Sequence, residues 1–179
     1  MSKLIETIAA KTPLEKTRAD LAVLTGVTAK DDFAVGRGDV IGVITASGLA
    51  RRRSRATMTV AFAVDAATGT VDDATVFVVG DVLKNSAGVT IGTILTIVGN
   101  VITLAANAAV AVAIGANAFG SDGSQTAKGI ADEGSDGDGD TPIAVFIGGC
   151  LDESLCLRLD ATAKTELAGS SRVGGIFKF

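Results

Sequence analysis

The densest cationic group in the chain consists of Arg51, Arg52, Arg53 and Arg55. Guanidinium groups donate paired hydrogen bonds to phosphate and carboxylate, so such a group can hold an anionic ligand or an acidic protein surface. No aromatic residue stands beside the arginines on which bases could stack, and binding of single-stranded nucleic acid is therefore poorly supported. The alternative is an exposed arginine-rich loop that has no partner.

Three aspartates, Asp136, Asp138 and Asp140, have the spacing of the first three ligands in an EF-hand calcium loop. An EF-hand would continue with glycine at its sixth position and glutamate at its twelfth, where this chain has Thr141 and Ile147. We therefore interpret this segment as an acidic, glycine-rich surface turn and assign no metal ligand.

The composition removes most catalytic mechanisms, because the chain contains no His, no Trp and no Tyr. Without imidazole there is no Ser-His or Cys-His nucleophile, no His-ligated metal and no ordinary base that titrates near neutrality. We expect a protein that is not an enzyme and that uses no cofactor. The two cysteines, Cys150 and Cys156, are too few for a disulfide framework, and we expect reduced thiols.

Charge is divided unevenly along the chain, which has 16 basic and 20 acidic residues and a net charge of −4. Residues 1–55 hold 10 cations and 6 anions, a net charge of +4, and residues 56–179 hold 6 cations and 14 anions, a net charge of −8. This division suits a protein that docks one face on an acidic surface and turns the other to solvent.

The N-terminal part carries a helix signal. Thr12-Pro13-Leu14-Glu15 is a capping box with proline at the first helical position, and Gly26 is a suitable C-terminal stop. We predict an N-terminal arm over residues 1–32 with a helix at about 13–25.

From Phe33 onward the hydrophobic period becomes that of strands. Gly99-Asn100 is a hairpin signal between two β-branched runs, residues 155–160 read as a short strand, and Asp160 is a suitable N-cap for a helix that Gly169 would end. The predicted fold class is mainly β with short helices.

A short sequence occurs twice, as Gly38-Asp39-Val40 and as Gly80-Asp81-Val82, and each copy is followed by an Ile-Gly step. Either the repeat marks a duplicated β-module in which each half turns at Gly-Asp into a strand, or it is a chance match in a chain rich in Gly and Val.

Two further segments carry a resemblance to a known family. Gly38, Val40, Gly42, Ile44, Ser47 and Gly48 match the pattern Gly-x-Val-x-Gly-x-Ile-x-x-Ser-Gly. Gly129, Ile130 and Glu133 follow a second pattern, Gly-Ile-Leu-x-Glu, with the Glu one residue later, and Gly148 and Gly175-Ile176 come after it. With these motifs the chain resembles the head decoration (capsid cement) proteins of lambda-like tailed bacteriophages, over residues 33–53 and 127–179.

The resemblance implies a β-tulip or β-barrel-like core formed by residues 33–70 and 120–179, with a β-hairpin module inserted at 71–119. It also implies a homotrimer that is made in the host cytoplasm and lies on the outer surface of an icosahedral phage head. The expected partner is the major capsid protein, and no contact with nucleic acid or membrane is expected. A phage surface or tail-associated module that recognises a host surface through the insertion is the alternative. The candidate capsid contacts are the basic residues Lys3, Lys11, Lys16, Arg18, Arg51, Arg52, Arg53 and Arg55.

Overall fold

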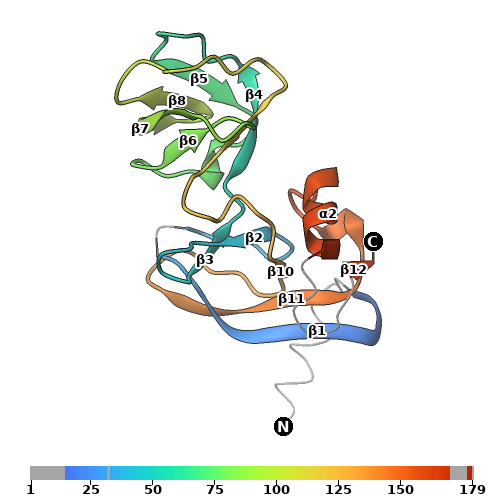
Figure 1. Cartoon of the computed structure of the whole chain (residues 1–179). Coiled ribbons are helices and arrows are strands. Elements are labelled where there is room, and N and C mark those ends of the chain that lie inside the picture. Colours follow the sequence, from blue (N-terminus) through green and yellow to red (C-terminus); the bar gives the residue numbers. More distant parts are fainter. Residues whose placement is uncertain (1–14, 32, 170–176, 179) are drawn as a thin grey trace.

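The computed structural model describes residues 15–31, 33–169 and 177–178. Its strands form two units, a curled sheet and a closed barrel, which occupy opposite ends of the molecule in Figure 1. The chain crosses from the sheet to the barrel near residues 53–54 and returns through residues 120–128. No helix in the described ranges has the length and apolarity needed to cross a membrane.

The sheet unit closes on itself. Its strands are neighbours in the order β1-β3-β2-β10-β11-β12. Because β1 also pairs with β11, the first five strands of this order form a ring, and β12 pairs with β11 alone. β1 is parallel to β3 and antiparallel to β11. The strands are β1 (Glu15–Ala29), β2 (Val40–Val43), β3 (Ala50–Arg52), β10 (Gly129–Ala131), β11 (Thr141–Leu151) and β12 (Phe177–Lys178).

Alternating residues of these strands supply two cores on opposite faces of the sheet. One cluster takes residues from β1, β2, β3, β10 and β11 and includes Ile41 and Val145, so it fills the inside of the curl. Their chain neighbours Val40 and Phe146 belong to a second cluster, which is covered by helix α2 (Ala161–Gly169). Asp160 starts α2 as predicted, since its carboxylate accepts a hydrogen bond from the Ala163 N–H at 2.6 Å.

The barrel is closed in the order β4-β5-β8-β7-β6-β9, in which β9 pairs with both β4 and β6. Its core includes Met58, Phe62 and Leu83, and the predicted hairpin at Gly99-Asn100 is confirmed, with Gly99 at φ 58°. Its elements are β4 (Arg55–Val60), β5 (Thr68–Val71), β6 (Val82–Lys84), β7 (Thr90–Val98), β8 (Val101–Leu104) and β9 (Asn117–Phe119), with the short helix η1 (Ala74–Val76).

The inserted unit is larger than the sequence suggested. β4 and all but the last residue of β5 lie within residues 33–70, the expected core, but these strands pair with barrel strands and not with the sheet. The reason is that the alternating Ala56 and Met58 point into the barrel core. By strand pairing the insertion spans residues 55–119.

The predicted helix at 13–25 is wrong. Residues 15–29 form the long strand β1, which pairs antiparallel with β11 from Glu15 opposite Leu151 to Ala29 opposite Thr141. A capping box is a local signal, and the backbone hydrogen bonds of a long partner strand outweigh it in a segment that ends in Thr and Val. Gly26 lies inside the strand and does not end a helix.

The strand expected at residues 155–160 is also wrong. The short helix η2 (Glu153–Leu155) occupies its start, and Arg158 takes up the left-handed conformation at φ 61°. Asp39 and Leu157 form an isolated parallel bridge instead. The irregular backbone directs the Arg158 side chain toward the barrel.

Candidate functional site

The arginine cluster lies inside the molecule, where the sheet unit meets the barrel; we call this region the junction. The side chains of Arg51 and Arg53 are only 1% and 3% exposed. The prediction that these two residues contact a partner at the surface is therefore wrong. The chain passes from one unit to the other at this point, so the arginines are enclosed by carboxylates that both units supply.

Arg51 links β3 to the barrel. Its guanidinium forms ion pairs with Asp81 and Asp122, each at 2.8 Å, and donates to the carbonyl oxygen of Val76 at 2.7 Å. The ring of Phe33 lies against the guanidinium, 3.7 Å from ring centre to carbon. Two carboxylates, a carbonyl and an aromatic face compensate the burial of this charge.

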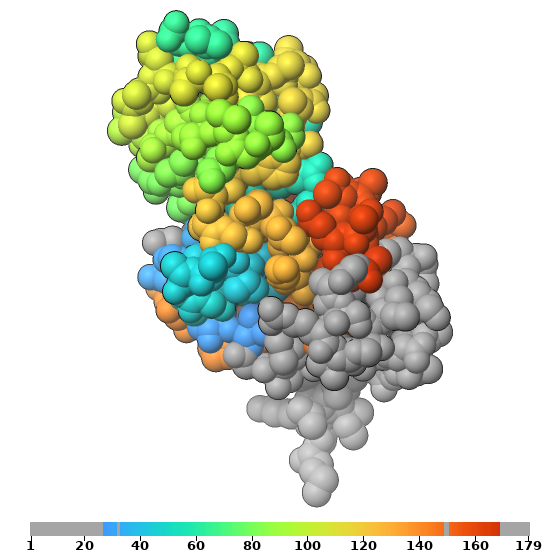
Figure 2. Space-filling view, in the orientation of Figure 1, coloured from blue at the N-terminus to red at the C-terminus, as the bar shows by residue number. Residues whose placement is uncertain are grey.

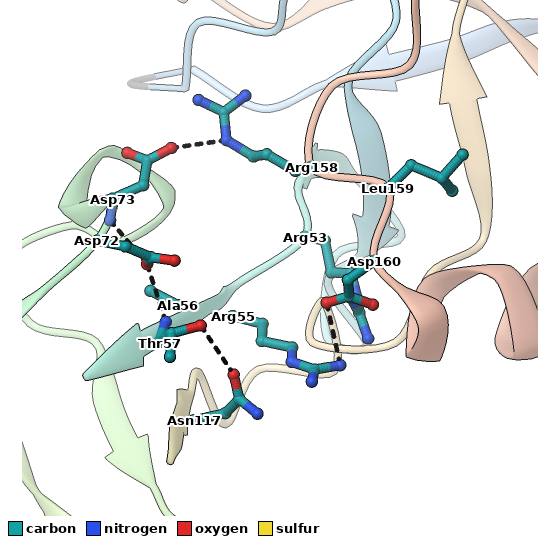
Figure 3. Close-up of a pocket in the computed structure, with 10 residues that line it drawn as sticks. All are labelled: Arg53, Arg55, Ala56, Thr57, Asp72, Asp73, Asn117, Arg158, Leu159 and Asp160. Carbon is teal, nitrogen blue, oxygen red and sulfur yellow. Dashed lines mark hydrogen bonds and ion pairs between the residues drawn. The ribbon is translucent and has the colours of Figure 1, made fainter. Parts of the chain in front are cut away.

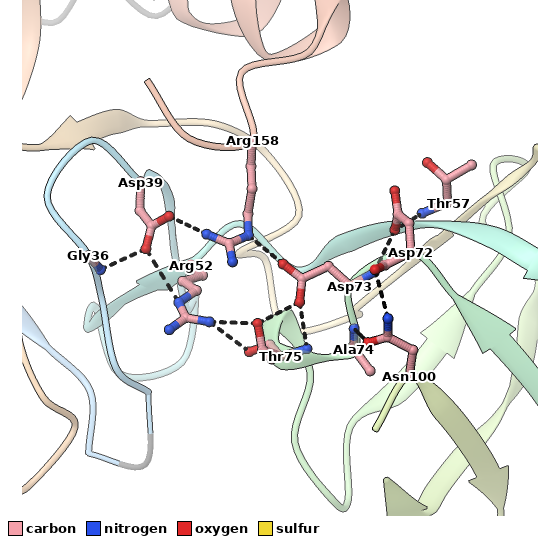
Figure 4. A network of polar contacts seen from close by, with 10 residues as sticks. All are labelled: Gly36, Asp39, Arg52, Thr57, Asp72, Asp73, Ala74, Thr75, Asn100 and Arg158. Atoms are coloured by element: carbon pink, nitrogen blue, oxygen red, sulfur yellow. Dashed lines mark hydrogen bonds and ion pairs between the residues drawn. The ribbon is translucent and has the colours of Figure 1, made fainter. Parts of the chain in front are cut away.

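Arg52 and Arg158 make a second link between the units, drawn in Figure 4. Arg158 donates to Asp39 of the sheet unit and, through Nε, to Asp73 of the barrel at 2.7 Å. Arg52 Nε lies 3.4 Å from Asp39 Oδ2, and its Nη1 donates to Thr75 Oγ1 of the barrel at 2.7 Å. Both arginines therefore contact both units.

Arg158 holds this position at the expense of backbone strain. A left-handed conformation costs a non-glycine residue about 1–2 kcal/mol. The chain around it is fixed by two backbone hydrogen bonds, from the Leu157 N–H to the Gly38 oxygen at 2.8 Å and from the Val40 N–H to the Leu157 oxygen at 3.2 Å. Strain of this kind persists only where the surrounding contacts determine the conformation.

Arg53 and Arg55 fasten α2 to the connection between the units. Arg53 pairs with Asp160 at 3.0 Å and with Glu166 at 2.9 Å, and Arg55 Nη1 lies 3.3 Å from Asp160 Oδ2. Burial lowers the pKa of Arg55, and the positive charge of Arg53 lowers it further, against the opposing effect of Asp160. The same aspartate thus caps a helix and forms ion pairs with two arginines.

Two carboxylates where the units meet, Asp73 and Asp122, are held in their ionised form. Burial would raise the pKa of Asp73 and of Asp122, but hydrogen bonds from Thr75 and Ser124, together with arginine, outweigh it and hold both values below the usual range. Burial likewise lowers the pKa of Arg158, but the charge of Asp39 and the contacts with Asp73 raise it overall.

The repeated Gly-Asp sequence forms the same turn in both units. The Asp39 N–H donates to the Gly36 oxygen at 3.1 Å, and the Asp81 N–H donates to the Val78 oxygen at 3.1 Å. Each aspartate then accepts a hydrogen bond from the first residue of its turn, at 2.7 Å and 3.0 Å. The preceding glycines both have positive φ, 90° and 93°. The sequence did not identify Asp39 and Asp81 as arginine partners, although this repeat was the available signal.

A cavity of about 300 Å³ opens between the units beside this network, as Figure 3 shows. Three arginines and three aspartates line it, so its formal charges balance. Most of these charges are already paired with one another, which leaves no excess charge to select an anion or a cation. The lining residues are Arg53, Arg55, Ala56, Thr57, Asp72, Asp73, Asn117, Arg158, Leu159 and Asp160.

The remaining basic candidates lie elsewhere. Lys16 and Arg18 belong to β1, whereas Lys3 and Lys11 lie outside the described residues. In the acidic turn, Asp140 accepts a hydrogen bond from the Asp31 N–H at 2.8 Å. Among the residues that the structure describes, no group of three or more His, Cys, Asp or Glu side chains is arranged to hold a metal ion.

The geometry of the junction fits a structural role, because its charged groups bind one another and connect the two units. Comparison of the chain with protein families, with curated proteins and with solved structures gave no match in any of the three.

Proposed function

We propose that the chain is a structural virion protein, a capsid decoration or cement protein that trimerises on the outside of an icosahedral phage head and stabilises the major capsid lattice. One observation carries the proposal. The two segments that resemble the decoration family are far apart in sequence, yet they are neighbouring strands, with Gly129 opposite Ile41 and Ile130 opposite Val40.

Two glycines of these segments, Gly42 and Gly129, are required by packing, which makes a chance match of small residues a weaker explanation. A Cβ at Gly42 would lie 1.9 Å from the Ser124 carbonyl oxygen. A Cβ at Gly129 would lie 2.4 Å from Val145 Cγ1 and 2.7 Å from the Phe146 oxygen. The matched motif positions therefore help to determine the sheet.

The junction supports the same role. A protein that reinforces a shell has to transmit load between its own parts, and here the buried Arg51 pairs with Asp81 of the barrel while the partly exposed Arg158 pairs with Asp73 of the barrel. No catalytic residue is proposed, since the charged side chains gathered at the junction neutralise one another.

Lys3, Lys11, Lys16 and Arg18 remain the proposed capsid contacts. Arg51 and Arg53 are buried, and Arg52 and Arg55 are half-buried and paired with carboxylates of the same chain. We expect the double variant Lys16→Glu/Arg18→Glu to bind heads more weakly than the wild type, and increasingly so at low salt, because charge reversal turns attraction to an acidic surface into repulsion. Lys128→Glu is the matched control, since Lys128 is an exposed lysine on the connection between the units.

Co-sedimentation of the purified protein with expanded heads that lack a decoration protein tests the proposal. We expect saturable binding in multiples of three copies, measured by quantitative gel densitometry of the pellet. A protein that stays in the supernatant at every concentration, with its fold verified by circular dichroism, would refute it.

One observation favours the second candidate, a module that recognises a host surface. The barrel has its own core and its own closed set of strands, as an independent recognition module would. Replacement of residues 55–119 by a short linker distinguishes the candidates. Loss of cell or glycan binding with retained head binding would favour the recognition module.

A further inference from the structure

A second cavity, of about 190 Å³, lies where the barrel meets the connection that returns to the sheet unit. Its walls are the turn between β6 and β7, the end of β9 and residue 125 of the connection. Figure 2 shows the green β6–β7 region of the barrel above the orange connection at the neck of the molecule. This cavity shares no lining residue with the cavity of about 300 Å³, so the two are separate.

Lys84 supplies the only charge that lines this second cavity. It is the one charged residue between Asp81 and Asp122 in the sequence, and both of these aspartates are paired with Arg51. Within the part of the chain that the structure describes, Lys84 forms no ion pair. The chain therefore leaves this positive charge without a counter-ion, in contrast to the arginines of the junction.

Two side-chain amides in the cavity wall have their oxygens already engaged. Asn85 Oδ1 accepts hydrogen bonds from the Ala87 and Val89 N–H groups, each at 3.0 Å. Gln125 Oε1 accepts one from the Gly123 N–H, also at 3.0 Å. Because a backbone N–H can donate only to the oxygen of an amide, these contacts leave the NH₂ groups of both side chains as donors.

The donor set of the cavity is that of a site for an oxyanion. One ammonium group and two amide NH₂ groups line it, the Ser86 hydroxyl adds a further donor, and no carboxylate is among the lining residues. Hydrogen bonds from a charged donor to an ionised acceptor are roughly twice as strong as those between neutral groups. A bound anion would therefore gain from Lys84 without competition from an acid of the same chain.

Size and charge select among the oxyanions. A volume of about 190 Å³ corresponds to about six water molecules, which is below the roughly 300 Å³ at which sites for whole small molecules begin. A single acidic group fits such a space, but a nucleotide does not. The one positive charge balances the one negative charge of a carboxylate, whereas a phosphate group carries close to two at neutral pH.

We infer that this cavity binds a carboxylate, with Lys84 as the counter-ion and the side chains of Asn85, Gln125 and Ser86 as hydrogen-bond donors. The carboxylate belongs either to a small free acid or to an acidic side chain of a partner protein. The inference does not rest on the proposed function.

Titration of the full chain with carboxylates, followed by amide NMR spectra at constant ionic strength, tests the site. We expect sodium acetate and N-acetyl-glutamate methylamide to produce saturable shifts of the side-chain NH₂ signals of Asn85 and Gln125. The uncharged N-acetyl-glutamine methylamide should leave these signals unchanged. Tighter binding of the glutamate derivative supports the site with an acidic side chain as the source, and tighter binding of acetate supports it with a free acid.

Lys84→Gln should weaken acetate binding by about tenfold or more, because it removes a charged donor. The matched control is Lys128→Gln, which removes an exposed lysine outside this cavity and should leave the affinity unchanged.

Asn85→Asp separates binding from the structure of the turn. An aspartate keeps the oxygen that accepts from Ala87 and Val89, but it replaces the NH₂ donor by a negative charge. We expect this variant to melt at the wild-type temperature and to lose the acetate-dependent shift of Gln125. A merely structural role of Asn85 predicts the opposite, retained binding.

Four results would overturn the inference: shifts that never saturate, equal binding of the glutamine derivative, phosphate that binds more tightly than acetate, or wild-type affinity in Lys84→Gln. The proposed function fails separately. A protein that binds acetate through Lys84 but does not bind heads would contradict the decoration role and leave the carboxylate site standing.

Discussion

At the scale of single side chains, Arg51 is the least exposed of the arginines whose side chains the structure describes. It is almost fully buried, and its two carboxylate partners belong to the barrel and to the connection that returns from it. Removal of one member of a buried ion pair leaves the other charges without compensation. The stability of the junction therefore depends on this side chain more than on any surface pair.

Arg51→Met should lower the free energy of unfolding by about 3–5 kcal/mol, because Asp81 and Asp122 lose a buried partner. Urea denaturation followed by circular dichroism measures this change. The control is Arg37→Met, which removes a half-exposed pair with Asp132 and should cost about 1 kcal/mol or less. Equal effects of the two substitutions would contradict the assigned role of Arg51.

Arg158 contacts both units from a strained backbone conformation. Arg158→Asn keeps the left-handed conformation accessible and removes both ion pairs, so the units should separate more often. We expect trypsin to cut the connections at Arg53, Arg55 and Lys128 about tenfold faster, which corresponds to about 1.4 kcal/mol.

Lys164→Asn is the control for this digestion, because it removes a surface pair with Glu153 in the same part of the chain. Mass spectrometry of the fragments identifies the cut sites. Unchanged cleavage in Arg158→Asn would show that the ion pairs do not hold the units together.

Close packing of elements depends on a few glycines. β2 passes so near residue 124 that a Cβ at Gly42 would overlap a backbone oxygen, which no side-chain rotation can relieve. Gly42→Ala should therefore destabilise the protein by about 1–3 kcal/mol or more. At Gly92 the nearest atom belongs to the flexible Leu104 side chain at 3.1 Å, so Gly92→Ala should cost less. A thermal melt by circular dichroism compares the two, and a harmless Gly42→Ala would contradict the packing.

Local signals predicted the elements that local interactions determine. The Gly99-Asn100 hairpin and the Asp160 cap follow from turn and capping chemistry within a few residues, and both are present. The helix predicted at 13–25 failed because β11, more than a hundred residues away, pairs with that segment. The barrel boundary failed for the same reason, since β4 pairs with β9.

The candidate site was less predictable than the fold. The sequence identified the arginine cluster, but it could not show that Asp122 and Asp160 enclose it, because these partners approach only after the chain has formed both units. A cluster of four arginines resembles a surface patch when its partners are distant in sequence. The repeated Gly-Asp turn was the one local feature that marked two of the partners, Asp39 and Asp81.

The stability of the whole molecule should fall in acid. The pKa values of Asp73 and Asp122 are lowered in the folded protein, so their contribution is complete above the usual carboxyl pKa of about 4 and is lost as the pH falls through the lowered values. The chain has no His to titrate near neutrality.

We expect the free energy of unfolding to be constant between about pH 6 and 8 and to fall below about pH 4. Circular dichroism is the appropriate probe, because the chain lacks Trp and Tyr. A loss of stability that begins near pH 6, or a gain on acidification, would contradict the assigned ion pairs.

We propose that this molecule strengthens a capsid from outside, with its two units joined by ion pairs around the buried Arg51. The most direct measurement is the temperature at which DNA-filled heads that lack a decoration protein release their DNA, determined by a DNA-binding dye with and without the purified protein. We expect a higher release temperature with the wild type and a smaller increase with Arg51→Met. An unchanged release temperature at a saturating concentration of folded wild type would contradict it.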